Sequence, residues 1–194
     1  MAAQVEAGKV LLDSEALNRT VARIAHEIVE GNPDLERTAL VGIHTRGVPL
    51  AQRLRRYIAD FGGVEVALGT VDITFHRDDV VVRDGQAPRH PQPVVRATRL
   101  DFPLEGMTCV LVDDVLYTGR TIRAAIDALF GYGRPERVQL AVLADRGHRE
   151  LPIRPDYVGK NLPTARDERI KVELVEVDEI DQVLLVQKEP ANHG

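Results

Sequence analysis

The sequence has very few of the residues on which several common kinds of binding site depend. It contains one cysteine in 194 residues, which excludes a disulfide framework and a pair of cysteine metal ligands. Tryptophan is absent and aromatic residues make up only 4%, so few rings are available to stack on nucleic-acid bases. The formal net charge of -5 argues against a surface that is basic throughout, although the 25 lysines and arginines can still gather on one face.

Membrane and nucleotide-binding motifs are also missing. No apolar run approaches the roughly 18 residues of a membrane span, and the first residues lack the basic-then-apolar pattern of a signal peptide. We therefore expect a cytoplasmic protein. The sequence has neither a P-loop, GxxxxGK[ST], nor a GxGxxG after an apolar run, so binding of nucleoside triphosphates or dinucleotides loses its usual support.

The order of periodic segments predicts one α/β domain over residues 1–194. Short apolar runs typical of buried strands alternate with amphipathic stretches of helical period, and this alternation favours a mostly parallel central sheet. We expect Ser14 to cap the first helix, Gly31 and Pro33 to end it, and Pro49 to lie in the first turn of the second. The expected strands are 39–43, one or two within 64–75, 107–112, 137–144, 170–177 and 182–188, and the expected helices are 14–33, 48–61 and 118–133.

Residues 76–100 interrupt this pattern. The segment is rich in proline and charge, and a loop of this length inside a compact domain usually has a function. We expect it to form a mobile surface arm.

The stretch VLVDDVLYTGRT, residues 110–121, combines features that suit one ligand. Asp113 and Asp114 follow an apolar run, and we expect them just beyond the carboxyl end of a strand, where α/β sheets bind ligands. The backbone N–H groups of residues 116–121 precede a helix, and a helix N-terminus attracts anions. Carboxylates repel a phosphate but accept hydrogen bonds from sugar hydroxyls, so a ribose 5-phosphate satisfies both halves. The Asp pair alone would equally suit a helix cap or a solvated turn.

The whole string closely resembles the phosphoribosyl-diphosphate binding motif of type I phosphoribosyltransferases. Further motifs resemble, more narrowly, the bifunctional regulators of pyrimidine operons, which attenuate transcription by binding messenger RNA and have uracil phosphoribosyltransferase activity. The motifs are ARIAHEI, LVGIHTRGVPLA, DITFHRDD and GRPERVQLAVLADRGHRELPIRPDYVGKNLPT. The resemblance implies the type I fold: a central, mostly parallel sheet flanked by helices, a flexible arm and a small hood over the base.

The resemblance also implies roles for individual residues. Asp113 and Asp114 match the carboxylates that hold the ribose hydroxyls, and Arg77, at the root of the arm, is positioned to reach the diphosphate on closure or else to form an ordinary ion pair. The 5-phosphate loop corresponds to Thr118, Gly119, Arg120 and Thr121, and the diphosphate loop to Thr45, Arg46 and Gly47. This sequence departs from the usual pattern at His44, His76 and Ala22, the last on the RNA-facing helix.

The implied reaction is uracil plus phosphoribosyl diphosphate giving UMP plus diphosphate. Such a displacement mainly needs orientation of the sugar and stabilisation of the leaving group, with no protein nucleophile. Mg²⁺ is expected as the cofactor, bound mainly through the substrate diphosphate and not by a dedicated protein metal site. Backbone groups at 144–146 and 153–157 are the candidates for reading the edge of uracil.

A messenger RNA leader is the second expected partner, with UMP as the signal, and we expect a homo-oligomer, a dimer or higher. Phosphate contacts by basic residues would supply much of the RNA affinity. Solvated helix faces or ion pairs remain the alternative for each of them, and a phosphoribosyltransferase without RNA regulation, or one specific for purines, remains the alternative for the whole chain. The predicted RNA-binding residues are Arg19, Arg23, His26, Arg146, Arg149 and Lys160, in regions that also hold Arg134, Arg137, His148 and Arg154.

Overall fold

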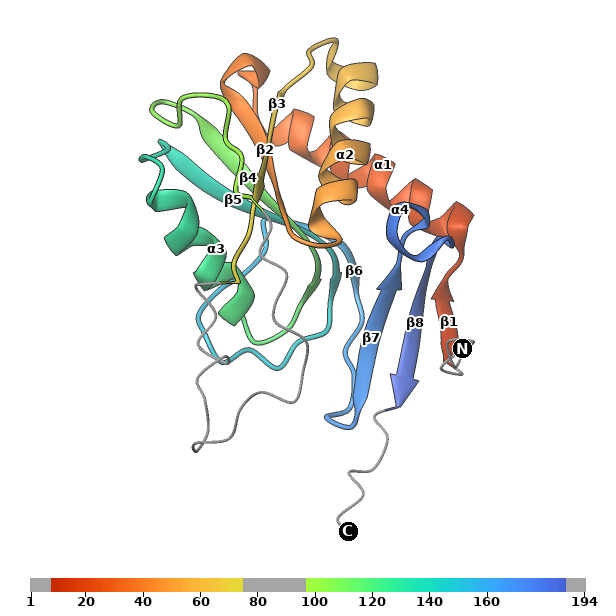
Figure 1. The fold of residues 1–194 in the computed structure, drawn as a ribbon. Helices are drawn as coiled ribbons and strands as arrows, with labels where there is room; N and C mark the ends of the chain where they lie inside the picture. The colour runs from red at the N-terminus through yellow and green to blue at the C-terminus, as the bar shows by residue number, and fades with distance from the viewer. Residues whose placement is uncertain (1–7, 75–96, 188–194) are drawn as a thin grey trace, which may run out of the picture.

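The computed structural model describes residues 8–74 and 97–187, which form two sheets with helices packed around the larger one (Figure 1). The larger sheet has parallel strands in the order β3-β2-β4-β5-β6, which confirms the expected α/β fold. These strands are β2 Thr38–Ile43, β3 Ala67–Val71, β4 Thr108–Leu116, β5 Arg137–Asp145 and β6 Tyr157–Asn161.

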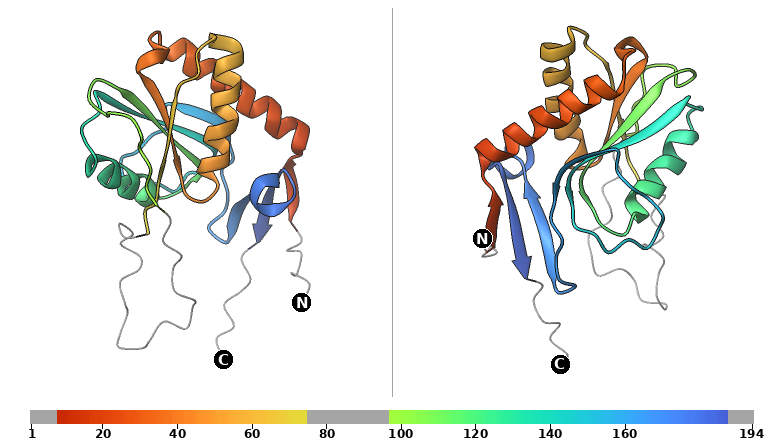
Figure 2. Two further views of the ribbon diagram at one scale, coloured as in Figure 1. Left: turned by 45° about the horizontal axis from the view of Figure 1, so that its top comes forward. Right: turned by 180° about the vertical axis from the view of Figure 1, so that it is seen from behind.

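Helices cover both faces of this sheet. The helices are α1 Ser14–Gly31, α2 Gly47–Gly62 and α3 Arg120–Phe130. A short 3-10 helix, Leu35–Arg37, lies between α1 and β2. Val110 and Val112 of β4 pack into a core cluster with α1 and α2, whereas Cys109 and Leu111 pack into a second cluster with α3. Figure 2 shows α1 and α3 on opposite sides of the sheet. Burial on both faces explains why the central strands are continuous apolar runs.

A small antiparallel sheet lies beside the N-terminal half of α1 (Figure 1). It contains β1 Lys9–Leu12, β8 Gln182–Gln187 and β7 Glu168–Glu173, and the one-turn helix α4 Val175–Asp178 connects β7 to β8. The two apolar runs at 170–177 and 182–188 were expected to be strands, and each contains one, but the first turns into α4 before it ends. The short strands β1 and β6 were not anticipated, because neither has a long apolar run to mark it.

The ends of α1 correct one sequence prediction. Asp13 is the N-cap, and its carboxylate accepts a hydrogen bond from the N–H of Ala16 at 2.8 Å, so the assignment of Ser14 as the cap was wrong. Aspartate and serine cap equally well, and the point at which the chain leaves β1 decides between them. The helix ends at Gly31 as expected, where a Cβ would lie 2.5 Å from the hydroxyl of Tyr157.

Strand β4 is longer than its apolar run. It continues to Leu116, and Asp113 pairs with Val142 and Leu116 with Asp145 of β5. The prediction that the two carboxylates lie beyond the end of the strand was therefore wrong, because main-chain pairing continues regardless of side-chain polarity. They lie inside β4, close to its carboxyl end.

Candidate functional site

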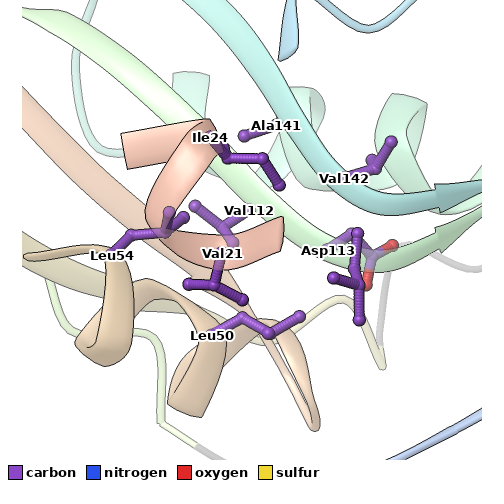
Figure 3. A pocket seen from close by; sticks show the side chains of 9 residues that line it. Val21, Ile24, Leu50, Leu54, Val112, Asp113, Ala141 and Val142 are labelled. Atoms are coloured by element: carbon purple, nitrogen blue, oxygen red, sulfur yellow. The ribbon is translucent and has the colours of Figure 1, made fainter. Parts of the chain in front are cut away.

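The carboxylate pair sits above a tightly packed core. Asp113 is 6% exposed, and the apolar cavity beneath it has a volume of about 10 Å³, space for about one water at most (Figure 3). Residues from α1, α2, β4 and β5 line this cavity, which is far too small for a sugar or a base. The cavity is lined by Val21, Ile24, Leu50, Leu54, Val112, Asp113, Ala141, Val142 and Leu143.

Each carboxylate is oriented by the backbone of the next residue. An oxygen of Asp113 accepts from the N–H of Asp114 at 3.0 Å, and an oxygen of Asp114 accepts from the N–H of Val115 at 2.8 Å. Burial raises the pKa of Asp114, while the Val115 N–H and the positive charge of Arg46 oppose that rise. Hydroxyl groups that donate to Asp114 would further favour its charged form.

The loop after β4 turns toward α3 through Gly119. This residue has φ of +94°, in the region that favours glycine, and a Cβ there would lie 3.3 Å from the side chains of Leu151 and Ile153. The carbonyl of Thr118 accepts from the N–H groups of Glu150 and Leu151 at 3.0 and 3.1 Å. The loop is thus held from the β5–β6 side, and it leads directly into the N-terminus of α3, where an anion is favoured.

The loop between β2 and α2 is pressed against β4. It contains a cis peptide bond between His44 and Thr45, and His44 N donates to Val71 O at 3.0 Å. A Cβ on Gly47 would lie 2.2 Å from the carbonyl oxygen of Val112, so only glycine permits this approach. The predicted diphosphate loop therefore lies directly beside the start of the carboxylate pair.

The side chain of Arg46 does not reach into open space from this loop. Its guanidinium forms a two-point ion pair with Asp178 of α4, with Nε–Oδ2 and Nη2–Oδ1 distances of 3.0 and 2.6 Å. This ion pair raises the pKa of Arg46 and, against the effect of burial, lowers the pKa of Asp178. The backbone N–H groups of the loop are therefore the donors available to an anion in this conformation. Arg46 could bind a diphosphate only by giving up its ion pair with Asp178 or by bridging both anions.

Other predicted site residues have their own partners. Arg120 forms an ion pair with Glu150 at 2.8 Å, and both side chains are more than half exposed. Arg77 and most of the predicted arm, residues 76–96, lie outside the described residues. The chain is described again from Ala97, and Arg99 and Thr70 exchange backbone hydrogen bonds of 2.8 and 2.9 Å beside β3.

The predicted RNA-binding residues of α1 are exposed but not without contacts. Arg19 pairs with Glu15. Arg23 pairs with Glu27 and donates to the carbonyls of Val158, at 3.2 Å, and Gly159. The ring of His26 stacks on a phenylalanine of α2. Lys160 is exposed on β6 beside these carbonyls.

Arg146 and Arg149 are held inside their own loop. Arg146 is 5% exposed, donates to Thr164 Oγ1 at 3.1 Å and lies 4.0 Å over the ring of Tyr117. Arg149 donates to the carbonyls of Tyr117 and Ile153 at 2.8 and 3.0 Å and pairs with Asp145. RNA contact by these two arginines stays a prediction, and their contacts give each a part in supporting the loop after β4.

Arg53 was not anticipated from the sequence. It is 6% exposed on α2 and pairs with Glu176 of α4 and with Asp181, which follows α4, at 2.6 and 2.7 Å. An arginine on the apolar face of a helix, between Leu50 and Leu54, was the available signal, because a buried guanidinium requires carboxylate partners. With the Arg46 ion pair, it ties the small sheet to the diphosphate loop.

Within residues 8–74 and 97–187, no helix is both long and apolar enough to cross a membrane. No group of three or more His, Cys, Asp or Glu side chains there is arranged to hold a metal ion.

Comparisons with known proteins agree with this geometry. The phosphoribosyl transferase domain family matches residues 8–179. The chain is 58% identical over 181 residues to "Bifunctional protein PyrR" of Thermus aquaticus, covering 93% of this chain and 97% of that protein. It is 51% identical over 180 residues to the protein of the same name from Halalkalibacterium halodurans, covering 93% and 98%.

Solved structures show the same fold at low identity. A hypoxanthine phosphoribosyltransferase of Trypanosoma cruzi matches with a TM-score of 0.66 and 20% identity, covering 94% of this chain and 98% of that one. An enzyme of Leishmania tarentolae, described as HGPRT-ase in complex with GMP, matches with a TM-score of 0.69 and 16% identity, covering 95% and 99%. At these identities the likeness concerns the fold and not the base that is used.

Proposed function

Because the chain belongs to the phosphoribosyl transferase domain family, and within it to the bifunctional PyrR proteins, we propose that it transfers the phosphoribosyl group of phosphoribosyl diphosphate to uracil, and that it also binds messenger RNA leaders to attenuate transcription of pyrimidine genes. Uridine nucleotides are the signal in this proposal. The protein would act in the cytoplasm, where these substrates and transcripts are found, as a homo-oligomer.

The close approach of Gly47 to β4 carries the catalytic half of the proposal. It sets the 44–47 loop beside the carboxylates, and the 117–121 loop follows them directly. A ribose over Asp113 and Asp114 would have its 5-phosphate toward the N-terminus of α3 and its diphosphate toward the 44–47 loop. One bound molecule can therefore engage two anion-binding loops and two hydroxyl acceptors at once.

The reaction joins a ring nitrogen of uracil to the anomeric carbon as the bond from that carbon to diphosphate breaks, and the proton of that nitrogen is released to the departing diphosphate or to water. The transition state has oxocarbenium character, so the residues of this chain orient the sugar and stabilise developing charge, and no side chain forms a covalent bond to it. Asp113 and Asp114 fix the ribose by accepting from its hydroxyls, and their negative charge also favours a cationic sugar. In our proposal Arg77 and the 76–100 arm close over the site and exclude water.

Mg²⁺ fits the donors at this site. Its preferred ligands are oxygens, and it usually retains water and binds with substrate phosphates. The two aspartates are the only acidic side chains of β4, and the described residues contain no complete metal cage. When bound, Mg²⁺ neutralises the diphosphate as a leaving group.

Uracil is proposed to bind beside β5. The candidate segments are 144–146 and 153–157, and both are held in place by backbone hydrogen bonds. Arg146 N donates to Leu116 O at 3.1 Å, and Ile153 N donates to Leu151 O at 2.8 Å. These two N–H groups are therefore engaged, and so are the carbonyls of Asp145, which accepts from Leu162 N at 2.7 Å, and of Ile153, which accepts from Arg149 Nε at 3.0 Å. In our proposal the remaining backbone groups of the two segments bind the edge of uracil.

Catalysis can be tested with Asp113→Asn combined with Asp114→Asn. Asparagine keeps the oxygen that accepts from the next backbone N–H, so the fold should be retained. Formation of UMP from uracil should fall to background, because neutral amides are weaker acceptors for the ribose hydroxyls. Hypoxanthine in place of uracil tests the base, and near-normal turnover in the double variant, or preference for the purine, contradicts the proposal.

The regulatory half is tested with Arg23→Ala. We expect weaker binding to a pyrimidine-operon leader RNA and a salt slope lower by roughly one unit per lost phosphate contact, with UMP strengthening the wild type. Arg123→Ala is the matched control, because Arg123 is also an exposed helical arginine facing an acidic residue four positions later. If wild type binds an unrelated transcript of equal length as well, only the transferase remains.

A further inference from the structure

Three ring side chains of α1 and α2 form an aromatic surface, which we define as His26, Tyr57 and Phe61. His26 and Phe61 are exposed, whereas Tyr57 is half-buried against the core. The rings of His26 and Phe61 stack with centroids 3.7 Å apart and planes 17° apart, and Tyr57 lies 5.9 Å from Phe61 at the same interplanar angle. Phe61 is 39% exposed although it is a large apolar residue. His26 and Phe61 therefore form a stacked pair of partly exposed rings at the contact between the two helices.

Cationic side chains border this surface. Arg23 lies one turn before His26 on α1, and its guanidinium pairs with Glu27 and is anchored by the carbonyl of Val158 at 3.2 Å. The guanidinium carbon of Arg56 lies 5.8 Å from the ring centre of Tyr57. Flat rings beside anchored cations are the combination with which proteins bind single-stranded nucleic acid, by stacking the bases and pairing the phosphates.

We propose that Phe61 and Tyr57, with His26, form a stacking platform for an unpaired base of the RNA. This inference rests on the proposed RNA-binding function and adds α2 residues to it. The chain has eight phenylalanines and tyrosines in total and no tryptophan, so a cluster of two of them with a histidine at the surface is a concentrated use of a scarce residue type. Stacking accepts any base, and it adds to the phosphate contacts that the arginines would make.

A substitution series at Phe61 separates stacking from charge. Phe61→Leu keeps an apolar residue that favours helix but removes the flat ring, whereas Phe61→Tyr keeps the ring. Phe130→Leu is the matched control, because Phe130 is a 50% exposed phenylalanine at the end of α3. Each full-length variant is titrated with pyrimidine-operon leader RNA and with an unrelated transcript of equal length, at two salt concentrations, after its melting temperature and hydrodynamic size are measured.

We expect Phe61→Leu to weaken leader binding by at least about fivefold, the loss of one stacked base, without changing the salt slope. Phe61→Tyr and Phe130→Leu should bind like wild type. Arg23→Ala should differ by lowering the slope, because it removes a phosphate contact.

Unchanged leader affinity in Phe61→Leu overturns the platform. So does a loss of affinity that accompanies a change in hydrodynamic size, which would assign Phe61 to an interface between copies of the chain. The wild-type protein is titrated with both transcripts before any variant is compared. If it binds the unrelated transcript as tightly as the leader, the proposed RNA function is contradicted independently of the platform.

Discussion

Replacing Gly47 with alanine tests the geometry on which the sugar site depends. The added methyl group would lie 2.2 Å from Val112 O and 3.1 Å from its carbonyl carbon. These are backbone atoms in the middle of the sheet and cannot rotate away. An ordinary carbon–oxygen contact is about 3.3 Å, so the start of α2 has to move by about 1 Å from β4.

The movement should affect both stability and activity. Overpacking of a buried contact costs about 1–3 kcal/mol, which lowers the melting temperature of a chain of this size by about 2–12 °C. Displacement of a binding loop by about 1 Å costs roughly 100-fold in rate. We therefore expect kcat/KM to fall by about that factor, with KM for phosphoribosyl diphosphate rising more than KM for uracil, because the 44–47 loop is the proposed diphosphate loop.

Gly62→Ala at the other end of α2 is the matched control. There the new methyl group would meet only the end of the flexible Leu35 side chain, at 2.5 Å, and alanine favours helix over glycine. Melting and steady-state kinetics of both variants decide the matter. If Gly47→Ala melts within 1–2 °C of wild type, in the range of ordinary scatter, and keeps its KM for phosphoribosyl diphosphate, the loop does not rest on β4 as described.

Three further outcomes follow from buried polar groups. Asp114→Asn should raise the melting temperature at neutral pH while abolishing uracil transfer. Burial raises the pKa of Asp114, so its charged form destabilises the fold at pH values above that pKa. A lower melting temperature in the variant would contradict this reasoning. Arg53→Ala should lower the free energy of unfolding in urea by about 3–5 kcal/mol, because it leaves Asp181 without its cation. The matched change at the exposed Arg19, Arg19→Ala, should lower it by less than about 1 kcal/mol. Equal losses in the two variants would contradict this difference. Cys109 is fully buried and its pKa is raised to about 11, so at pH 8 it should react with a disulfide reagent only as fast as the protein unfolds, and rapid labelling of the native protein would show otherwise.

Much of the site was predictable because its residues are neighbours in the chain. The order of strands and helices follows from local periodicity, and the 110–121 stretch holds its carboxylates and its anion-binding loop within twelve residues. Backbone amides at a helix N-terminus bind anions in any α/β fold, so residue types and spacing were sufficient. The same reasoning ended β4 too early, because side-chain polarity does not report where main-chain pairing stops.

Side-chain partners distant in the sequence were decided only by the tertiary structure. Arg46 stood in the predicted diphosphate loop, yet its guanidinium is held by Asp178, 132 residues away. Arg146 and Arg149 are predicted to bind RNA, and the structure shows in addition that both support the loop after β4. A charged residue has similar local preferences in each of these settings, so the sequence alone does not identify its partner. The sequence by itself determined the fold class and the family, and it supplied the residues of the proposed sugar site. The packing of α1, α2 and the small sheet decides which cations remain available to a ligand, and it brings Phe61 next to His26. These contacts join residues that are far apart in the sequence, so local patterns do not predict them.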